Sequence, residues 1–361
     1  MTWRRYHRYA DILRYLEYLQ HSHSDLVELI PLGRSSEGLP LVAVKISLPS
    51  NETKVKNIGG KEKKWKLRSR MKPAVWVDGG AHAREWIAPA VASWIIHTLV
   101  EGEKGLGRIS LLHTKCCRSN HKQHDVLRQA DFYIMPVMNP DGYEHSHTHD
   151  RLWRKTRSRQ PEYADSYYVG WYSKEFFLFR FPWNWGQTEC IGVDADRNWD
   201  YHWGEKDSSQ DPCSDNYAGP HPFSEPETRA VSDFLAEHRG QIKLYISLHA
   251  YSQAWLVPSS HAYAGFSDDA VLTEMGKLAT TALADLYGTK YQVGTAAEIR
   301  QPASGMSHDW AKARAGIKYA YHIDLRDVFG PYGFLLPGSQ IVSTAKETWQ
   351  ACKAIVDNLS V

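Results

Sequence analysis

The chain has 361 residues, of which 42% are hydrophobic and 23% are charged, and its formal net charge is +2. These ordinary globular values exclude a wholly disordered, collagen-like or coiled-coil chain, and the charge balance gives no reason to expect partners such as nucleic acid or a membrane surface. The longest mostly apolar stretch, residues 87–100, is shorter than the ~20 residues of a membrane span. The first residues lack the apolar core of a signal peptide, so we expect none in this chain.

Hydrophobic patterns predict strands and helices that alternate along the chain. Helices are expected where apolar residues recur every three to four positions, and strands in short apolar runs bounded by turn residues. Such alternation favours an α/β fold with a largely parallel or mixed sheet covered on both faces. In chain order we predict a helix over 11–19, strands over 41–46 and 74–78, a helix over 85–100, a strand over 132–138 with a turn at 139–142, a helix from a capping box at 224–227 to about 238, a strand over 243–248, a helix over 271–286, a strand over 318–323 and a helix over 340–359.

The domain organisation predicted from this pattern is a single domain over 1–361, because no linker rich in Pro, Gly or Ser divides the chain. Three stretches are interpreted as insertions: 54–72, 113–124 and 157–188. The first is lysine-rich, which indicates a solvated loop or an anion-binding patch. The third is rich in aromatic residues and is interpreted either as a lid over a cleft or as an error of gene prediction.

The five cysteines are too few for a scaffold built on disulfides. Cys116 and Cys117 are adjacent, Cys352 stands alone, and Cys190 and Cys213 lie 23 residues apart. The sequence therefore predicts at most one or two bridges.

A candidate metal site comes from His82 and Glu85, which follow a predicted strand and two glycines. Zinc in catalytic sites is held by neutral imidazoles and carboxylates, with one position left open. A His-x-x-Glu pair alone is weak support, but His249 and Asp324 also stand at the carboxyl ends of predicted strands. Since ligands gather beyond those ends in α/β sheets, the four residues together predict a metal hydrolase.

Several arginines are placed to bind an anion near this site. Planar guanidinium groups suit a carboxylate because they bond it through two N–H groups. Each arginine taken singly is equally compatible with an ordinary surface position or an ion pair. The candidates are Arg84, Arg151, Arg154 and Arg197.

Eight motifs in order resemble the zinc metallocarboxypeptidases of the carboxypeptidase A/B family, from about residue 6 to 359. They are residues 80–87, 139–143, 151–157, 194–199, 224–227, 247–252, 325–327 and 332–337. The resemblance implies a mixed, twisted, eight-stranded sheet between helices in a single domain. It also implies a secreted, extracellular monomer made with an N-terminal propeptide that this chain lacks, and a disulfide between Cys190 and Cys213 in an oxidising compartment.

The resemblance further implies one Zn²⁺ per chain, held by His82, Glu85 and His249, with water in the fourth position. The partners it implies are peptide or protein C-termini, from which the family removes the last residue by zinc-promoted attack of water. Arg154 matches the arginine that stabilises the oxyanion. Residues matching substrate-contacting positions are Arg84, Arg197 and Tyr251.

Three residues depart from the family pattern. Asp324 stands at the position of the catalytic glutamate, Asp196 at that of the asparagine that binds the substrate carboxylate, and Gln301 at that of a mobile tyrosine. An aspartate is one methylene short, and a misplacement of ~1 Å can cost ~10²-fold in rate. An anionic Asp196 would face the substrate carboxylate at a cost of ~1–4 kcal/mol.

Two functions from different classes are therefore compatible with the sequence. The first is an active zinc carboxypeptidase with unusual specificity and Asp324 in the general-base position. The second is a catalytically weak or inactive homologue that binds zinc and peptide C-termini as a binding or regulatory protein. The intact zinc ligands favour the first, and the three departures favour the second.

The residue that sets specificity in the family is matched by His308, at the bottom of the pocket for the C-terminal side chain. His322 matches another pocket position, and Arg300 lies nearby in sequence. We expect a preference for acidic or polar C-terminal residues that strengthens as pH falls from about 7.5 to about 6, because imidazole gains charge there. The alternative is that both histidines pair with nearby carboxylates and never face the substrate.

Overall fold

The structure, a computed structural model, describes residues 1–48, 72–102, 126–159, 190–262, 265–328 and 330–359. Its centre is the predicted mixed sheet of eight strands. From one edge to the other these are β1 (Val27–Arg34), β2 (Pro40–Ile46), β4 (Asp131–Met135), β3 (Ala74–Gly79), β5 (Ile242–Ala250), β8 (Tyr319–Leu325), β6 (Ala254–Val257) and β7 (Gln292–Thr295).

The central strands β4, β3, β5 and β8 run parallel to one another. Nearly all of their residues are buried, as expected for parallel strands that are covered on both faces and therefore consist of continuous apolar runs. The antiparallel pairs lie toward the edges, where β1 pairs with β2, β2 with β4, and β6 with β8. The parallel centre is the part of the sheet that positions the candidate site.

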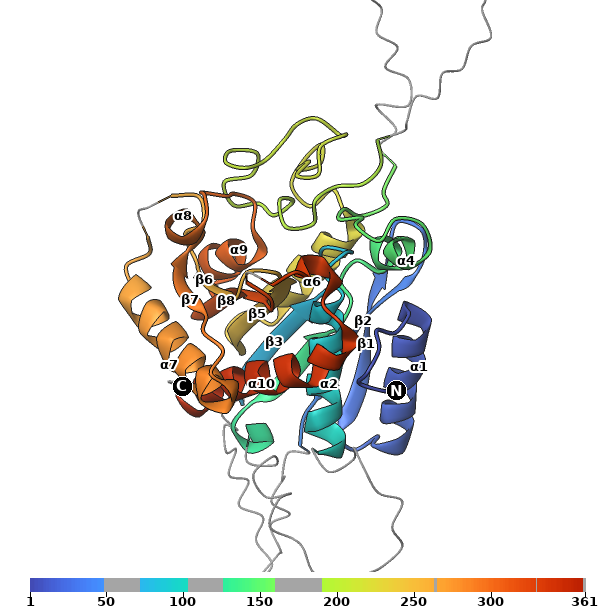
Figure 1. Cartoon of the computed structure of the whole chain (residues 1–361), viewed down its shortest axis with the longest axis vertical. Helices are drawn as coiled ribbons and strands as arrows, with labels where there is room; N and C mark the ends of the chain where they lie inside the picture. The colour runs from blue at the N-terminus through green and yellow to red at the C-terminus, as the bar shows by residue number, and fades with distance from the viewer. Residues whose placement is uncertain (49–71, 103–125, 160–189, 263–264, 329, 360–361) are drawn as a thin grey trace, which may run out of the picture.

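Four long helices share one core with one face of the sheet: α1 (Tyr9–Ser22), α2 (Ile87–Glu101), α7 (Asp269–Tyr287) and α10 (Ile341–Asp357). In Figure 1, α2 and α10 cross in front of the strands. Helix α1 buries a stripe of Tyr9, Ile12, Leu16 and Leu19 and leaves its other side polar, which is the helical period that predicted it.

A second core lies on the opposite face of the sheet, where α6 (Pro226–Glu237) and α9 (Ser307–Ala313) pack. Side chains alternate between the faces of a strand, so Trp76 of β3 belongs to this core while Val75 and Val77 belong to the first. The remaining elements in the described ranges are α4 (Pro140–Thr148), α8 (Ala296–Ile299) and the 3₁₀ turns η2 (Gly333–Leu335) and η3 (Gly338–Gln340).

The structure differs from the prediction at several element ends. The predicted turn at 139–142 is the start of α4: Asn139 caps the helix by accepting a hydrogen bond from the Gly142 N–H, and Pro140 takes the first helical position. The predicted capping box at 224–227 is wrong. The residue before α6 is Glu225, with no capping hydrogen bond from its side chain.

The elements missing from the prediction are short or irregular. Strands β6 and β7 and helix α8 have four residues each, too few to show a period. Strand β1 contains Pro31 and Gly33, between which its register to β2 shifts, and both residue types weaken a strand pattern.

The expected insertions fall almost entirely outside the described residues. Of 54–72 only Lys72 is described, and of 157–188 only residues 157–159. The stretch 113–124, with Cys116 and Cys117, lies outside as well.

Candidate metal centre and its cavity

The candidate site lies at the carboxyl ends of β3, β5 and β8, as the sequence predicts. In the register of β5 and β8, Ser247 stands beside His322 and His249 beside Asp324. Residues two apart on a strand share a face, so these four side chains lie on one face of two neighbouring strands. The histidine and the acid expected at one sheet edge are therefore direct neighbours.

His82 and Glu85 lie between β3 and α2, in a segment that glycine permits. A Cβ on Gly79 would stand 3.0 Å from the backbone carbonyl of Ala88, so the start of α2 can approach the strand end closely only without a side chain there. Helix α2 begins at Ile87, later than the predicted start at 85. His82 and Glu85 consequently belong to a tight turn, with the Glu85 N–H donating to the His82 carbonyl over 3.2 Å.

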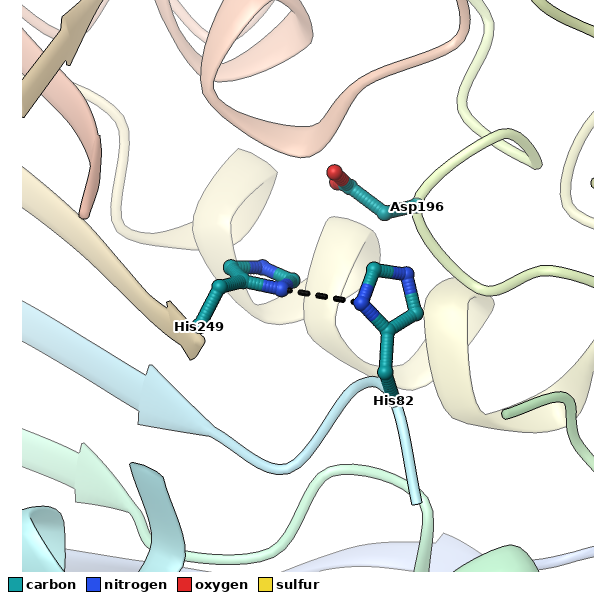
Figure 2. Close-up of side chains that lie close together, drawn as sticks. All are labelled: His82, Asp196 and His249. Atoms are coloured by element: carbon teal, nitrogen blue, oxygen red, sulfur yellow. Dashed lines mark hydrogen bonds between the residues drawn. The ribbon is translucent and has the colours of Figure 1, made fainter. Parts of the chain in front are cut away.

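The three predicted metal ligands meet in a compact triangle of buried donor atoms. His82 Nδ1 lies 2.9 Å from Glu85 Oε1, His249 Nδ1 lies 3.1 Å from Glu85 Oε2, and the two Nδ1 atoms are 3.1 Å apart. Figure 2 shows the two rings turned toward each other. Their other nitrogens are engaged elsewhere: His82 Nε2 with Asp194 at 3.0 Å and His249 Nε2 with Ser247 at 2.9 Å.

This triangle fits a zinc ion. Tetrahedral zinc with bonds of about 2.0–2.2 Å holds its donors about 3.3 Å apart, and two imidazoles with one carboxylate form a known catalytic set. Burial alone would raise the pKa of Glu85, but the imidazoles of His82 and His249 outweigh it and hold that pKa well below its usual range. The glutamate is therefore ionised, the form that binds a metal.

Asp196 is a second carboxylate close to the two histidines. One ligand atom from each of His82, Asp196 and His249 lies within 4.8 Å of the others, and Figure 2 shows Asp196 projecting from a neighbouring loop. Its Oδ1 accepts the Ser307 N–H at 3.1 Å, and its Oδ2 lies 3.4 Å from His322 Nδ1. Glu85 approaches the imidazole nitrogens more closely and is the better third ligand.

Asp324 has both carboxylate oxygens engaged. Its Oδ1 lies 3.0 Å from His322 Nε2, and its Oδ2 accepts from Ser252 at 3.0 Å and pairs with Arg300 at 2.7 Å. Burial would raise the pKa of Asp324, but the charges of Arg300 and His322 outweigh it and lower the pKa. The His322 ring in turn stacks on His249, with centroids 3.9 Å apart.

Three of the four arginines expected to handle anions face a carboxylate of the chain itself. Arg154 donates to Asp194 from Nε and Nη2, at 3.1 and 2.8 Å. Arg197 pairs with Asp207 at 2.6 Å, and Arg84 lies 3.4 Å from Asp215. Arg151 instead donates to the carbonyls of Arg84 and Phe334 and covers the Trp86 ring, which is a structural role.

A cavity of about 620 Å³ surrounds these groups. Charged and polar side chains dominate its wall, and the expected residues Gln301 and Tyr251 are part of it. Its lining residues are His82, Arg84, Glu85, Arg154, Asp196, Arg197, Asp207, Asp215, Asn216, His249, Ala250, Tyr251, Ala296, Arg300, Gln301, Ala303, Met306, His322, Asp324 and Phe334.

A family model described as zinc carboxypeptidase matches residues 12–351. This chain belongs to the zinc carboxypeptidase family. It is 35% identical to carboxypeptidase B of Astacus astacus over 362 residues, covering 99% of this chain and 98% of that protein. It is 37% identical to human carboxypeptidase A6 over 354 residues, covering 98% of this chain and 67% of that protein.

Solved zinc carboxypeptidase structures share the fold. Bovine thrombin-activatable fibrinolysis inhibitor, in complex with tick carboxypeptidase inhibitor, matches with a TM-score of 0.76 and 32% identity, covering 99% of this chain and 98% of that one. Carboxypeptidase A from Helicoverpa armigera matches with a TM-score of 0.75 and 26% identity, covering 99% of this chain and 74% of that one. Zinc is the cofactor of this family, and the triangle of donors here accommodates it.

Two further features of this family member are a disulfide bond and the character of its helices. Cys190 and Cys213 form a disulfide with Cα atoms 4.8 Å apart, which confirms the expected pairing. Among the helices in the described ranges, none combines the length and the apolar character that a bilayer span needs.

His308 does not line the cavity. It is fully buried, with Nε2 3.0 Å from Ser260 Oγ and 3.4 Å from Asp309. Burial lowers the pKa of His308 to about 3, so the ring is neutral between pH 6 and 7.5 and cannot supply the expected pH dependence. Arg300 and His322 line the cavity instead.

Sequence reasoning did not assign three residues that matter here. Asp194 holds His82 and Arg154 together, Asp207 occupies Arg197, and Ser252 bonds Asp324. Asp194 lies within the motif at 194–199 that carries the family resemblance, so its position in the sequence could have indicated a role in the site. Asp207 lies in an irregular segment where no local pattern indicates its role.

Proposed function

We propose that this chain is an active zinc-dependent carboxypeptidase that removes the C-terminal residue of peptides, with zinc held by His82, Glu85 and His249. The observation that carries the proposal is the triangle of buried donors, 2.9–3.1 Å apart, inside a cavity large enough for a C-terminal side chain. When bound, zinc supplies a Lewis acid and lowers the pKa of water to about 7.

The chain's own residues supply the remaining functions. The two arginines that match substrate-contacting positions, Arg197 and Arg84, both line the cavity. Arg154 lines it too, next to the zinc ligand His82 through their shared partner Asp194. Its guanidinium suits the negative charge that develops on the carbonyl oxygen during attack, where fixed positive groups stabilise the transition state most.

Asp324 takes the general-base role in this proposal. It stands beside His249 in the strand register and lines the cavity. Its ion pair with Arg300 is accessible, since the Arg300 side chain is 40% exposed. Arg300 can therefore turn toward an anionic substrate and leave the Asp324 oxygen available to accept a proton.

The second candidate function is zinc-dependent binding of peptide C-termini with little or no turnover. It is favoured by the contacts that occupy both oxygens of Asp324 and by Asp207, which fills the anion-binding side of Arg197. A general base that stays engaged loses most of the ~10²–10⁴-fold that such a group contributes.

The substrate class we propose is peptides ending in acidic or polar residues. Arg300, His322, Ala303 and Met306 are among the residues that line the cavity. Arg300 supplies a cation there, and the acid nearest to it, Asp324, is already paired. A basic C-terminal side chain would meet like charge, whereas a glutamate side chain can replace Asp324 as the partner of Arg300.

Metal analysis and turnover of N-blocked dipeptides on one sample test the function. The dipeptides end in Glu, Gln, Phe and Arg, and the His249→Ala variant is the control. We expect about one zinc per chain, turnover lost with zinc in the variant, and Glu or Gln ahead of Arg. Zinc-loaded protein that binds the dipeptides without cleaving them would establish the second function.

The disulfide between Cys190 and Cys213 supports secretion, because such bonds persist in oxidising compartments. We propose a secreted monomer whose partners are peptide or protein C-termini. The near-neutral charge gives no support for nucleic acid or a membrane as partners.

A further inference from the structure

A line of buried hydrogen bonds leads from the middle of the sheet to His249. Trp76 Nε1 donates to Asp78 Oδ2 at 2.7 Å, and Ser247 Oγ donates to Asp78 Oδ1 at 2.6 Å. The same Ser247 oxygen lies 2.9 Å from His249 Nε2. Each of the four side chains is at most 1% exposed, so bulk water cannot take over these bonds.

The direction of these bonds follows from which groups can donate. Both oxygens of Asp78 accept, one from Trp76 Nε1 and the other the single proton of the Ser247 hydroxyl. The Ser247 oxygen is then left as an acceptor, and it selects the His249 tautomer with its proton on Nε2. In that tautomer the lone pair of Nδ1 points toward His82 Nδ1 and Glu85 Oε2, both 3.1 Å away.

The sheet register builds this line. Strands β3 and β5 are parallel neighbours in which Asp78 stands beside Ser247. Trp76 precedes Asp78 by two residues and His249 follows Ser247 by two, so all four lie on one face. Strand β5, which carries Ser247, is hydrogen-bonded to β3 on one side and to β8 on the other. The backbone of both neighbouring strands therefore fixes the position of the Ser247 hydroxyl.

The two histidine ligands are supported differently. His82 donates directly to Asp194, which also binds the cavity residue Arg154. Asp78 and Ser247 are absent from the cavity wall. Of the three proposed zinc ligands, His249 is the one that Ser247 contacts directly.

We propose that Ser247 and Asp78 are positioning residues that hold His249 as an Nδ1 ligand and thereby set the zinc affinity of the site. This inference rests on the zinc site of the proposed function but not on turnover. Partners behind a metal-binding histidine fix its tautomer and orientation, and losing one typically costs 10–100-fold in metal affinity.

The experiment measures the zinc dissociation constant of metal-free protein by competition with a chelator. The variants are Ser247→Ala, Ser247→Thr, which keeps the hydroxyl, and Asp78→Asn. Ser232→Ala is the matched control, because it removes a buried serine hydroxyl that donates to the Arg229 carbonyl on α6, away from the zinc site. Circular dichroism and thermal unfolding of the metal-free proteins report folding separately.

We expect Ser247→Ala to weaken zinc binding by about 10–100-fold, with Ser247→Thr and Ser232→Ala within about threefold of the parent. Asp78→Asn should weaken binding too, since an amide cannot accept from both Ser247 and Trp76. In the cobalt-substituted proteins, the visible absorption band should change in Ser247→Ala and stay unchanged in Ser232→Ala.

The outcomes separate this inference from the proposed function. Unchanged zinc affinity and an unchanged cobalt spectrum in a folded Ser247→Ala protein would overturn the positioning role alone. If that variant does not fold, parent-like affinity in Asp78→Asn overturns it instead. Zinc-loaded parent without turnover would overturn only the proposed activity, and a parent that binds no zinc would overturn both.

Discussion

At the scale of single residues, Asp324 has the right chemistry and a short reach. It lies beside His249 on the neighbouring strand, but its carboxylate is one methylene shorter than the glutamate of the family resemblance. Arg300 and His322 hold both oxygens in place. The loss of rate that an aspartate causes in place of a glutamate depends on how far its carboxylate lies from the reacting atoms, since about 1 Å of misplacement can lower a rate ~10²-fold.

We expect Asp324→Glu to raise kcat/KM by about 10–100-fold because it restores that reach. Steady-state kinetics on an N-blocked dipeptide ending in Glu measure the change. Asp324→Asn is the control and should lose ~10²–10⁴-fold if the carboxylate accepts a proton. Lower activity in a folded Asp324→Glu protein would mean that the site has adapted to the shorter acid.

A second prediction at this scale concerns the ion pair between Asp207 and Arg197. Its carboxylate lies 2.6 Å from an Arg197 nitrogen, where we place the substrate carboxylate. We expect Asp207→Asn to lower KM several-fold with little change in kcat, because substrate no longer displaces an internal anion. Asparagine also suits the positive φ of 44° at this position.

The control for this variant is Asp215→Asn. Asp215 lies 3.4 Å from Arg84 and is 74% exposed, so its loss should change KM little. A raised KM in Asp207→Asn would instead show that Asp207 holds Arg197 in its binding position.

At the scale of elements, the first turn of α6 buries an acid that the helix does not need for capping. Glu227 is fully buried. Its Oε1 accepts the Ser36 N–H at 3.3 Å, and within the described ranges its Oε2 has no hydrogen-bond partner. Burial, and then the nearby Glu225, raise the pKa of Glu227 from 4.5 to about 8. The capping-box prediction failed here because both acids of the motif face the interior.

The raised pKa gives the stability a pH dependence of known sign. Between pH 4.5 and 8 the folded protein keeps the Glu227 proton while the unfolded chain releases it, so stability falls as pH rises through this range. We expect Glu227→Gln to be more stable than the parent by about 1–3 kcal/mol at pH 7.5 and equal to it near pH 4. Urea unfolding at the two pH values measures this, and a constant difference would contradict it.

At the scale of the whole molecule, zinc should link segments that are far apart in the chain. His82 and Glu85 precede α2, whereas His249 belongs to β5, so an ion bound by all three exists only in the folded state. We expect free zinc at 100 times its dissociation constant to stabilise the protein by about 2.7 kcal/mol. Calorimetry should show a transition that rises with zinc in the parent and stays constant in His249→Ala.

Much of this architecture could be predicted from the sequence because it depends on local patterns. The apolar runs of β3, β5 and β8 and the stripes of α1 and α10 follow periods that span one element. The four-residue elements near 254–257 and 292–299 could not be predicted, since they are too short for a period and owe their existence to neighbours.

By itself, the sequence determined the family, the mixed sheet and the residues that meet in the proposed metal centre. The spacing of His82 and Glu85 and the strand ends at His249 and Asp324 are local facts, and parallel strands bring their carboxyl ends to one edge. Only the tertiary structure decided that His308 is buried outside the cavity lining, that Asp207 occupies Arg197, and that Ser247 stands beside Asp78. Those pairings depend on strand register and loop packing, which no short stretch of sequence specifies.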